Sequence, residues 1–134
     1  MQRFIMDKLI EWKNDKNRKP LILKGARQVG KTYILQEFGA NYYENTAYFN
    51  FDHDYGLAEL FLNTKDPKRI IEQLSLAAGK KINPNTTLII FDEIQECPNA
   101  LNSLKYFCEE ASEYHVACAG FLLGIRLSKI SFPV

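Results

Sequence analysis

Gly25-Ala26-Arg27-Gln28-Val29-Gly30-Lys31-Thr32 matches the pattern G-x-x-x-x-G-K-[ST] at every fixed position. A short apolar run, Leu21-Ile22-Leu23, precedes it, and a helical pattern begins at Thr32. The glycines let the backbone bend so that successive N–H groups point at one centre, where the N-terminus of the helix also favours an anion. The stretch therefore predicts a buried strand, a phosphate-binding loop (P-loop) and a helix in direct succession.

A second apolar run ends on two acids, because Leu88-Ile89-Ile90-Phe91 leads directly to Asp92 and Glu93. Ligands of open α/β sheets bind at the carboxyl ends of the strands, so these acids are expected to face the P-loop. We expect Asp92 and the Thr32 hydroxyl to hold Mg²⁺, and Lys31 to reach the β- and γ-phosphates of ATP. Glu93 is the candidate general base that polarises the attacking water, which favours ATP hydrolysis.

Strand and helix patterns alternate along the chain after a first helix, which predicts a mostly parallel sheet covered by helices on both faces. We expect an α/β, three-layer P-loop NTPase fold with about four strands in a single domain, residues 1–134. The expected helices cover residues 5–12, 32–38, 57–61, 67–79 and 98–111, with Gly39 ending the second; the expected strands cover residues 21–23, 47–51, 87–91 and 115–119.

The composition is that of an ordinary globular domain, with 46% hydrophobic and 25% charged residues among 134. A net charge of +1 argues against a strongly basic nucleic-acid binder, although basic residues crowd the N-terminal quarter. The three cysteines form no metal-type pairs, and as free thiols they suit a reducing, cytoplasmic setting. No apolar stretch approaches the roughly 20 residues that a membrane span needs, so no membrane partner is expected.

Several polar residues are weaker candidates. Asn50 and Asp52 are expected to support a loop rather than bind the nucleotide, and Gln95 and Glu96 are expected at the surface, with contact to the site as the alternative. Arg126 is expected to be solvated, with action on a neighbouring subunit's nucleotide as the alternative. His53 and His115 are interpreted as surface and strand-start residues, and the aromatic residues Tyr42, Tyr43, Tyr48, Phe49 and Phe51 as core.

The chain resembles the prokaryotic AAA-type ATP-binding proteins in which an ATPase domain precedes a C-terminal domain of unknown function. Four segments carry the resemblance over nearly the whole chain: residues 18–32, Asn50-Phe51-Asp52, Phe91-Asp92-Glu93-Ile94-Gln95 and residues 119–124. The resemblance implies an ATPase that uses ATP and Mg²⁺, with Lys31 and Glu93 as catalytic residues and Thr32 and Asp92 as metal-binding residues. The implied cofactor-binding residues are Gly25, Ala26, Arg27, Gln28, Val29, Gly30, Lys31, Thr32 and Tyr33.

Two departures from the family pattern bear on activity. Members usually carry a small polar residue after the Ala-Gly pair, where this chain has Phe121, which cannot donate a hydrogen bond to phosphate. The family domain also continues into a fifth strand, a helical lid and the C-terminal domain, all of which we expect to be missing here. Both departures argue against ATP hydrolysis more strongly than against ATP binding.

Three functions stay open at this point. The first is an ATPase domain with weak or partner-dependent turnover, and the second is a nucleotide-dependent binding module without turnover. The third, a P-loop small-molecule kinase, fits least because Arg126 is the only arginine after Arg69. The sequence does not show what the ATP cycle acts on: DNA, a protein and a toxin-like partner all stay open. A homo-oligomer is also compatible with the sequence.

Overall fold

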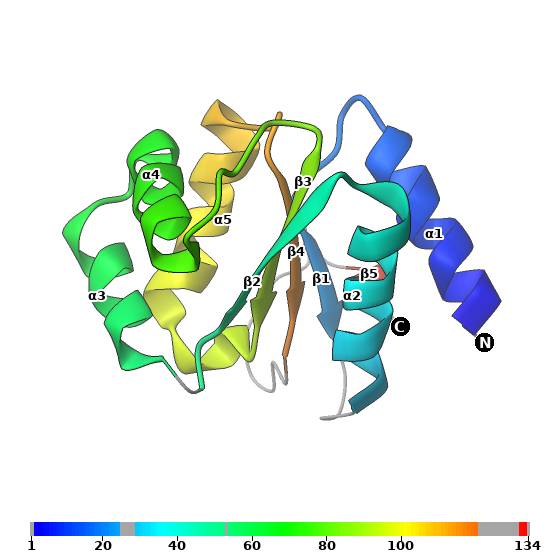
Figure 1. The fold of residues 1–134 in the computed structure, drawn as a ribbon, viewed down its shortest axis with the longest axis horizontal. Coiled ribbons are helices and arrows are strands. Elements are labelled where there is room, and N and C mark those ends of the chain that lie inside the picture. The colour runs from blue at the N-terminus through cyan, green and yellow to red at the C-terminus, as the bar shows by residue number, and fades with distance from the viewer. Residues whose placement is uncertain (1, 25–28, 53, 121–131, 134) are drawn as a thin grey trace.

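The computed structural model describes residues 2–24, 29–52, 54–120 and 132–133, and Figure 1 shows its elements. Helices and strands alternate in the order expected. The elements are α1 (Gln2–Asn14), β1 (Leu21–Lys24), α2 (Val29–Tyr42), β2 (Asn45–Asn50), α3 (Tyr55–Asn63), α4 (Pro67–Ala78), β3 (Thr87–Asp92), the 3₁₀ helix η1 (Ile94–Glu96), α5 (Pro98–Glu110), β4 (His115–Ala119) and β5 (Phe132–Pro133). Within these ranges, no helix is long and apolar enough to cross a lipid bilayer.

The molecule has three layers, with a parallel sheet between two groups of helices (Figure 1). The strand order is β2-β3-β4-β1-β5, and α1 and α2 cover one face while α3, α4 and α5 cover the other. Each face has its own apolar cluster: Leu35 and Phe38 of α2 lie in one, and Leu104 and Phe107 of α5 lie in the other. The expected three-layer α/β class with four main strands is confirmed.

One detail of the sheet corrects the expectation that a fifth strand is missing. Phe132–Pro133 forms the short parallel strand β5 beside β1, with Leu23 opposite Phe132 and Lys24 opposite Pro133. A strand at the edge of a sheet presents unpaired N–H and C=O groups, and β5 pairs with that edge of β1. The described residues do not test the expected absence of a helical lid, which stays a prediction.

Local signals place α4 as expected. Asp66 caps its N-terminus by accepting a hydrogen bond from the Lys68 N–H group at 3.2 Å, and Pro67 occupies the first helical position. Gly79 ends the helix in the left-handed conformation, with φ of 68°.

Gly39, by contrast, does not end α2 as predicted, because the helix continues to Tyr42. Gly39 is buried against the sheet, and a Cβ atom built on it would lie only 2.3 Å from Thr46 Oγ1 and 3.2 Å from Leu88 Cδ2. The glycine therefore serves the close approach of α2 to β2 and β3 rather than a helix end.

A polar and aromatic cluster joins α1 and α2 to the amino end of β4. His115 starts β4 as expected but is buried, with Nδ1 2.6 Å from the Tyr43 hydroxyl and Nε2 3.1 Å from Asn85 Oδ1. The Asn85 oxygen only accepts, so Nε2 carries the proton and the Tyr43 hydroxyl donates to Nδ1. Burial, together with the cations Arg18 and Lys13, lowers the pKa of His115 to about 4, so the ring is neutral at physiological pH.

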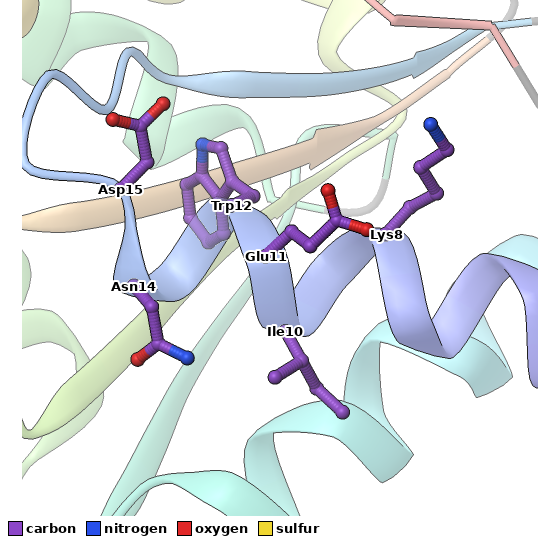
Figure 2. A pocket seen from close by; sticks show the side chains of 6 residues that line it. All are labelled: Lys8, Ile10, Glu11, Trp12, Asn14 and Asp15. Atoms are coloured by element: carbon purple, nitrogen blue, oxygen red, sulfur yellow. The ribbon is translucent and has the colours of Figure 1, made fainter.

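Helix α1 contributes Trp12 to this cluster. The indole Nε1 donates to the Lys19 carbonyl oxygen at 2.6 Å, and the ring packs 5.8 Å from the His115 ring and 6.3 Å from the Phe38 ring, centroid to centroid. Helix α1 and the turn after it also border an open hollow, shown in Figure 2, which is lined among the described residues by Lys8, Ile10, Glu11, Trp12, Asn14 and Asp15. None of these is a predicted site residue.

We predict that Gly39→Ala destabilises the protein by about 1–2 kcal/mol, although alanine is the better helix former by about 1 kcal/mol. The added methyl group must displace Thr46 or α2 itself. Urea unfolding monitored by circular dichroism measures the change. Ala40→Gly, at the exposed neighbouring position of α2, is the control for helix propensity, and Thr46→Ala in the Gly39→Ala background is expected to restore part of the loss. A Gly39→Ala protein more stable than the parent would contradict the close approach.

Candidate functional site

The candidate site lies at the carboxyl ends of the parallel strands, the lower edge of the sheet in Figure 1. β1 runs into the glycine-rich loop and α2 begins at Val29, so Gly30, Lys31 and Thr32 occupy the first turn of this helix. Of the predicted P-loop residues, Gly25, Ala26, Arg27 and Gln28 lie outside the described residues, as do the side chains of Val29 and Lys31.

The Thr32 hydroxyl donates a hydrogen bond to Asp92 Oδ2 at 2.8 Å. The two residues are 60 positions apart in the chain. Thr32 lies in α2, which follows β1, and Asp92 ends β3; β4 lies between β1 and β3 in the sheet. The fold therefore brings the last residue of the P-loop motif and the first acid of the pair into direct contact. This is the arrangement expected of two groups that share one metal ion.

Asp92 is the last residue of β3, every residue of which is buried, and its own side chain is 6% exposed. Three groups donate to its carboxylate. Oδ2 accepts from Thr32 and also from the Tyr48 hydroxyl at 2.5 Å, and Oδ1 accepts from the Glu93 N–H group at 2.9 Å. Hydrogen bonds of this kind offset the cost of burying a carboxylate.

Tyr48 was interpreted as a core residue, and that interpretation is wrong. Its side chain is 37% exposed, on the face of β2 opposite to the buried Ala47 and Phe49. β2 pairs with β3 so that Tyr48 lies beside Ile90 and Asn50 beside Asp92, which places Tyr48 on the α2 side of the sheet. Partial burial and then the hydrogen bond to Asp92 raise the pKa of Tyr48 to about 12, so at neutral pH the phenol donates to Asp92.

The strand alternation contained the signal that places Tyr48. Ala47 and Phe49 are the apolar residues of β2 that face the core, so the residue between them must face the other side. Of the other aromatic residues interpreted as core, Phe49 and Phe51 are buried, Tyr43 is half-buried and Tyr42 is 42% exposed.

Glu93 follows Asp92 in a left-handed backbone conformation, with φ of 55° and ψ of 46°. This conformation is uncommon for a residue other than glycine and turns the chain sharply from β3 into η1. The turn separates the two acids: Asp92 faces α2, whereas Glu93 is half-buried and its Oε1 accepts from Gln95 Nε2 at 2.7 Å.

Gln95 therefore touches the site, and its expected place at the surface is corrected. Gly120, directly after β4, packs against it: a Cβ atom on Gly120 would lie 2.4 Å from Gln95 Oε1 and 3.2 Å from the Ile94 backbone nitrogen. The neighbouring ends of β3 and β4 thus meet at Gln95, and a side chain at position 120 would have to displace the Gln95 amide and would crowd the Ile94 backbone nitrogen. In the sequence, the signal for this contact is the position of Gln95, two residues after the candidate catalytic acid Glu93.

The remaining candidates are placed as follows. Asn50 supports its loop as expected, because its Oδ1 accepts from the Asp52 N–H group at 2.8 Å, and its Nδ2 donates to the Tyr48 hydroxyl oxygen at 3.3 Å. Tyr33 is 56% exposed, one residue beyond Thr32, and Glu96 is exposed. His53, Phe121 and Arg126 lie outside the described residues.

The residues present fit a magnesium ion. In nucleotide sites Mg²⁺ is held by one or two protein oxygens together with phosphate oxygens and waters. The Thr32 hydroxyl and the Asp92 carboxylate supply a neutral and an anionic oxygen in hydrogen-bond contact at the start of a helix. Cys97, Cys108 and Cys118 are free thiols, and the described residues contain no cluster of three or more His, Cys, Asp or Glu that would hold a metal by itself.

Comparisons with known proteins agree with this fold. A family model described as an AAA domain matches residues 17–131. The solved structure titled "Structure of C. elegans PCH-2" is similar to the chain with a TM-score of 0.57 at 13% sequence identity, a likeness of fold. The match covers 99% of this chain but 42% of PCH-2, so the chain spans less than half the length of that neighbour. The comparison with curated proteins returned no match.

Proposed function

The chain belongs to the AAA domain family, and we propose that it is an ATPase domain that binds ATP with Mg²⁺ and hydrolyses it. The single observation that carries this proposal is the hydrogen bond of 2.8 Å between Thr32 and Asp92. It joins the two sequence motifs that a P-loop ATPase needs at one point of the sheet. The proposal covers residues 1–134 as one ATPase core.

Each residue of the site has a distinct proposed role. The backbone N–H groups of residues 25–32 and the Lys31 ammonium group bind the phosphates, and Tyr33 lies at the rim of the nucleotide site. Thr32 and Asp92 would hold Mg²⁺, which when bound neutralises charge on the β- and γ-phosphates. Glu93 orients a water molecule and accepts its proton as the water attacks the γ-phosphorus, so that ADP and inorganic phosphate leave.

A nucleotide-dependent binding module without turnover is the second candidate, and one contact favours it. The Glu93 carboxylate is engaged by the Gln95 amide at 2.7 Å. Hydrolysis requires this carboxylate to accept a proton from water, so a Glu93 held by Gln95 suits ATP binding better than turnover. Phe121 stands where members of the family that the chain resembles usually carry a small polar residue, which supports the same candidate.

Further proposals follow from the resemblance of the sequence. We propose a prokaryotic protein whose ATP cycle acts on a protein or DNA partner, and its free thiols support a cytoplasmic setting. A homo-oligomer is compatible with this proposal, with no arginine assigned to act between copies. We also propose that the chain is the counterpart of the ATPase domain that, in the prokaryotic proteins it resembles, precedes a C-terminal domain of unknown function.

We predict that the chain binds Mg-ATP with a dissociation constant in the micromolar range, roughly −8 kcal/mol, and that Lys31→Ala weakens binding at least about tenfold. The lysine supplies the point charge on the β- and γ-phosphates. Isothermal titration calorimetry measures both affinities. Lys68→Ala, which removes an exposed lysine from α4 on the other face of the sheet, is the matched control and should bind like the parent. No binding by the folded parent would overturn the proposed function.

We predict that Glu93→Gln retains ATP binding but lowers phosphate release about 100-fold or more, because the amide cannot accept the proton of the attacking water. A multiple-turnover phosphate assay measures the rate, and calorimetry checks the binding. Glu96→Gln, an exposed glutamate three residues further on, is the control with the same change of charge. If the parent binds ATP and releases no phosphate, the binding module is the better description; if Glu93→Gln releases phosphate at the parental rate, Glu93 is not the base.

A further inference from the structure

Asp92 Oδ2 accepts hydrogen bonds from two hydroxyl groups at once. Thr32 of α2 donates to it at 2.8 Å and Tyr48 of β2 donates to it at 2.5 Å. The first contact belongs to the predicted site. The second comes from a residue outside both sequence motifs, on the strand at the edge of the sheet beside β3.

The carboxylate of Asp92 has few acceptor positions left. Its two oxygens together offer about four lone-pair positions, and Thr32, Tyr48 and the Glu93 N–H group take three of them. With the side chain only 6% exposed, solvent contributes little. The hydrogen bonds thus satisfy the buried negative charge.

Tyr48 is the donor best placed to leave. The Glu93 N–H group is part of the backbone and Thr32 is part of the first turn of α2, whereas the Tyr48 side chain is 37% exposed on an edge strand. A phenol that leaves Asp92 still has solvent, and the Asn50 amide is already 3.3 Å from its oxygen. Its departure therefore leaves no buried polar group without a partner.

We propose that the Tyr48 hydroxyl competes with hydrated Mg²⁺ for Asp92 Oδ2, and that Tyr48 thereby sets the Mg²⁺ concentration at which the site takes up ATP. The inference rests on the proposed function, since it assumes that Asp92 belongs to the Mg²⁺ site. Tyr48 acts through Asp92 and is a positioning residue rather than a catalytic one.

The alternative effect of Tyr48, orienting Asp92 for the metal, predicts the opposite result. Two other donors, Thr32 and the Glu93 N–H group, bind the two carboxylate oxygens separately and fix the carboxylate plane without Tyr48. Removal of the phenol hydroxyl therefore frees an acceptor position without releasing the side chain.

The test measures ATP binding by calorimetry at a series of Mg²⁺ concentrations, for the parent and for Tyr48→Phe. We expect Tyr48→Phe to lower the Mg²⁺ concentration for half-maximal binding about three- to tenfold, in keeping with the net contribution of one typical hydrogen bond. ATP affinity measured in EDTA should be the same for both proteins. Tyr42→Phe, which changes a tyrosine with a similar exposed fraction of 42% at the far end of α2, is the control.

The outcomes separate the two proposals. If the parent binds Mg-ATP and Tyr48→Phe has an unchanged or higher Mg²⁺ requirement, the competition is refuted while the proposed function stands. If the parent does not bind ATP at all, both are refuted. Tyr48→Leu, which also lacks the hydroxyl, must shift the Mg²⁺ requirement in the same direction, and urea unfolding confirms that both variants fold.

Discussion

The buried carboxylate of Asp92 connects α2, β2 and β3 at the carboxyl ends of the strands. A carboxylate that is 6% exposed must be hydrogen-bonded, and Asp92 obtains its three donors from α2, from β2 and from the backbone just beyond β3. These contacts align the first turn of the P-loop helix with the strand that carries the acids. The same carboxylate is the proposed Mg²⁺ ligand, so one side chain serves both the order of the site and its chemistry.

The parallel topology determines which groups meet around this carboxylate. All strands end at the same edge, where β4 lies between β1 and β3. The connection from β1 to β2 passes over one face through α2, and the connection from β3 to β4 passes over the other through α5. The chain therefore leaves β1 and β3 toward opposite faces, on either side of β4, which is where a ligand finds space in an open sheet.

The two acids are divided by a single backbone turn. The backbone of Asp92 belongs to β3 and its side chain faces α2. The left-handed conformation of Glu93 directs the chain into η1 and toward Gln95. Gly120 allows the end of β4 to approach Gln95 closely. The proposed roles of the two acids, binding a metal and activating a water, need different surroundings, and this turn supplies them to adjacent residues.

The sequence by itself determined most of the elements and which residues are the candidates for the site. The apolar run before residues 25–28 and the helical pattern after them, the apolar run before Asp92, the Asp66 cap and Gly79 are local signals. Each predicted its element correctly because its physics acts within a few residues. Only the tertiary structure decided that Tyr48 shares Asp92 Oδ2 with Thr32, that Gln95 binds Glu93, that Gly39 packs on Thr46 rather than ending α2, and that His115 is buried. These pairings depend on strand order, register and the approach of a helix to the sheet, which are set by the packing of segments far apart in the chain.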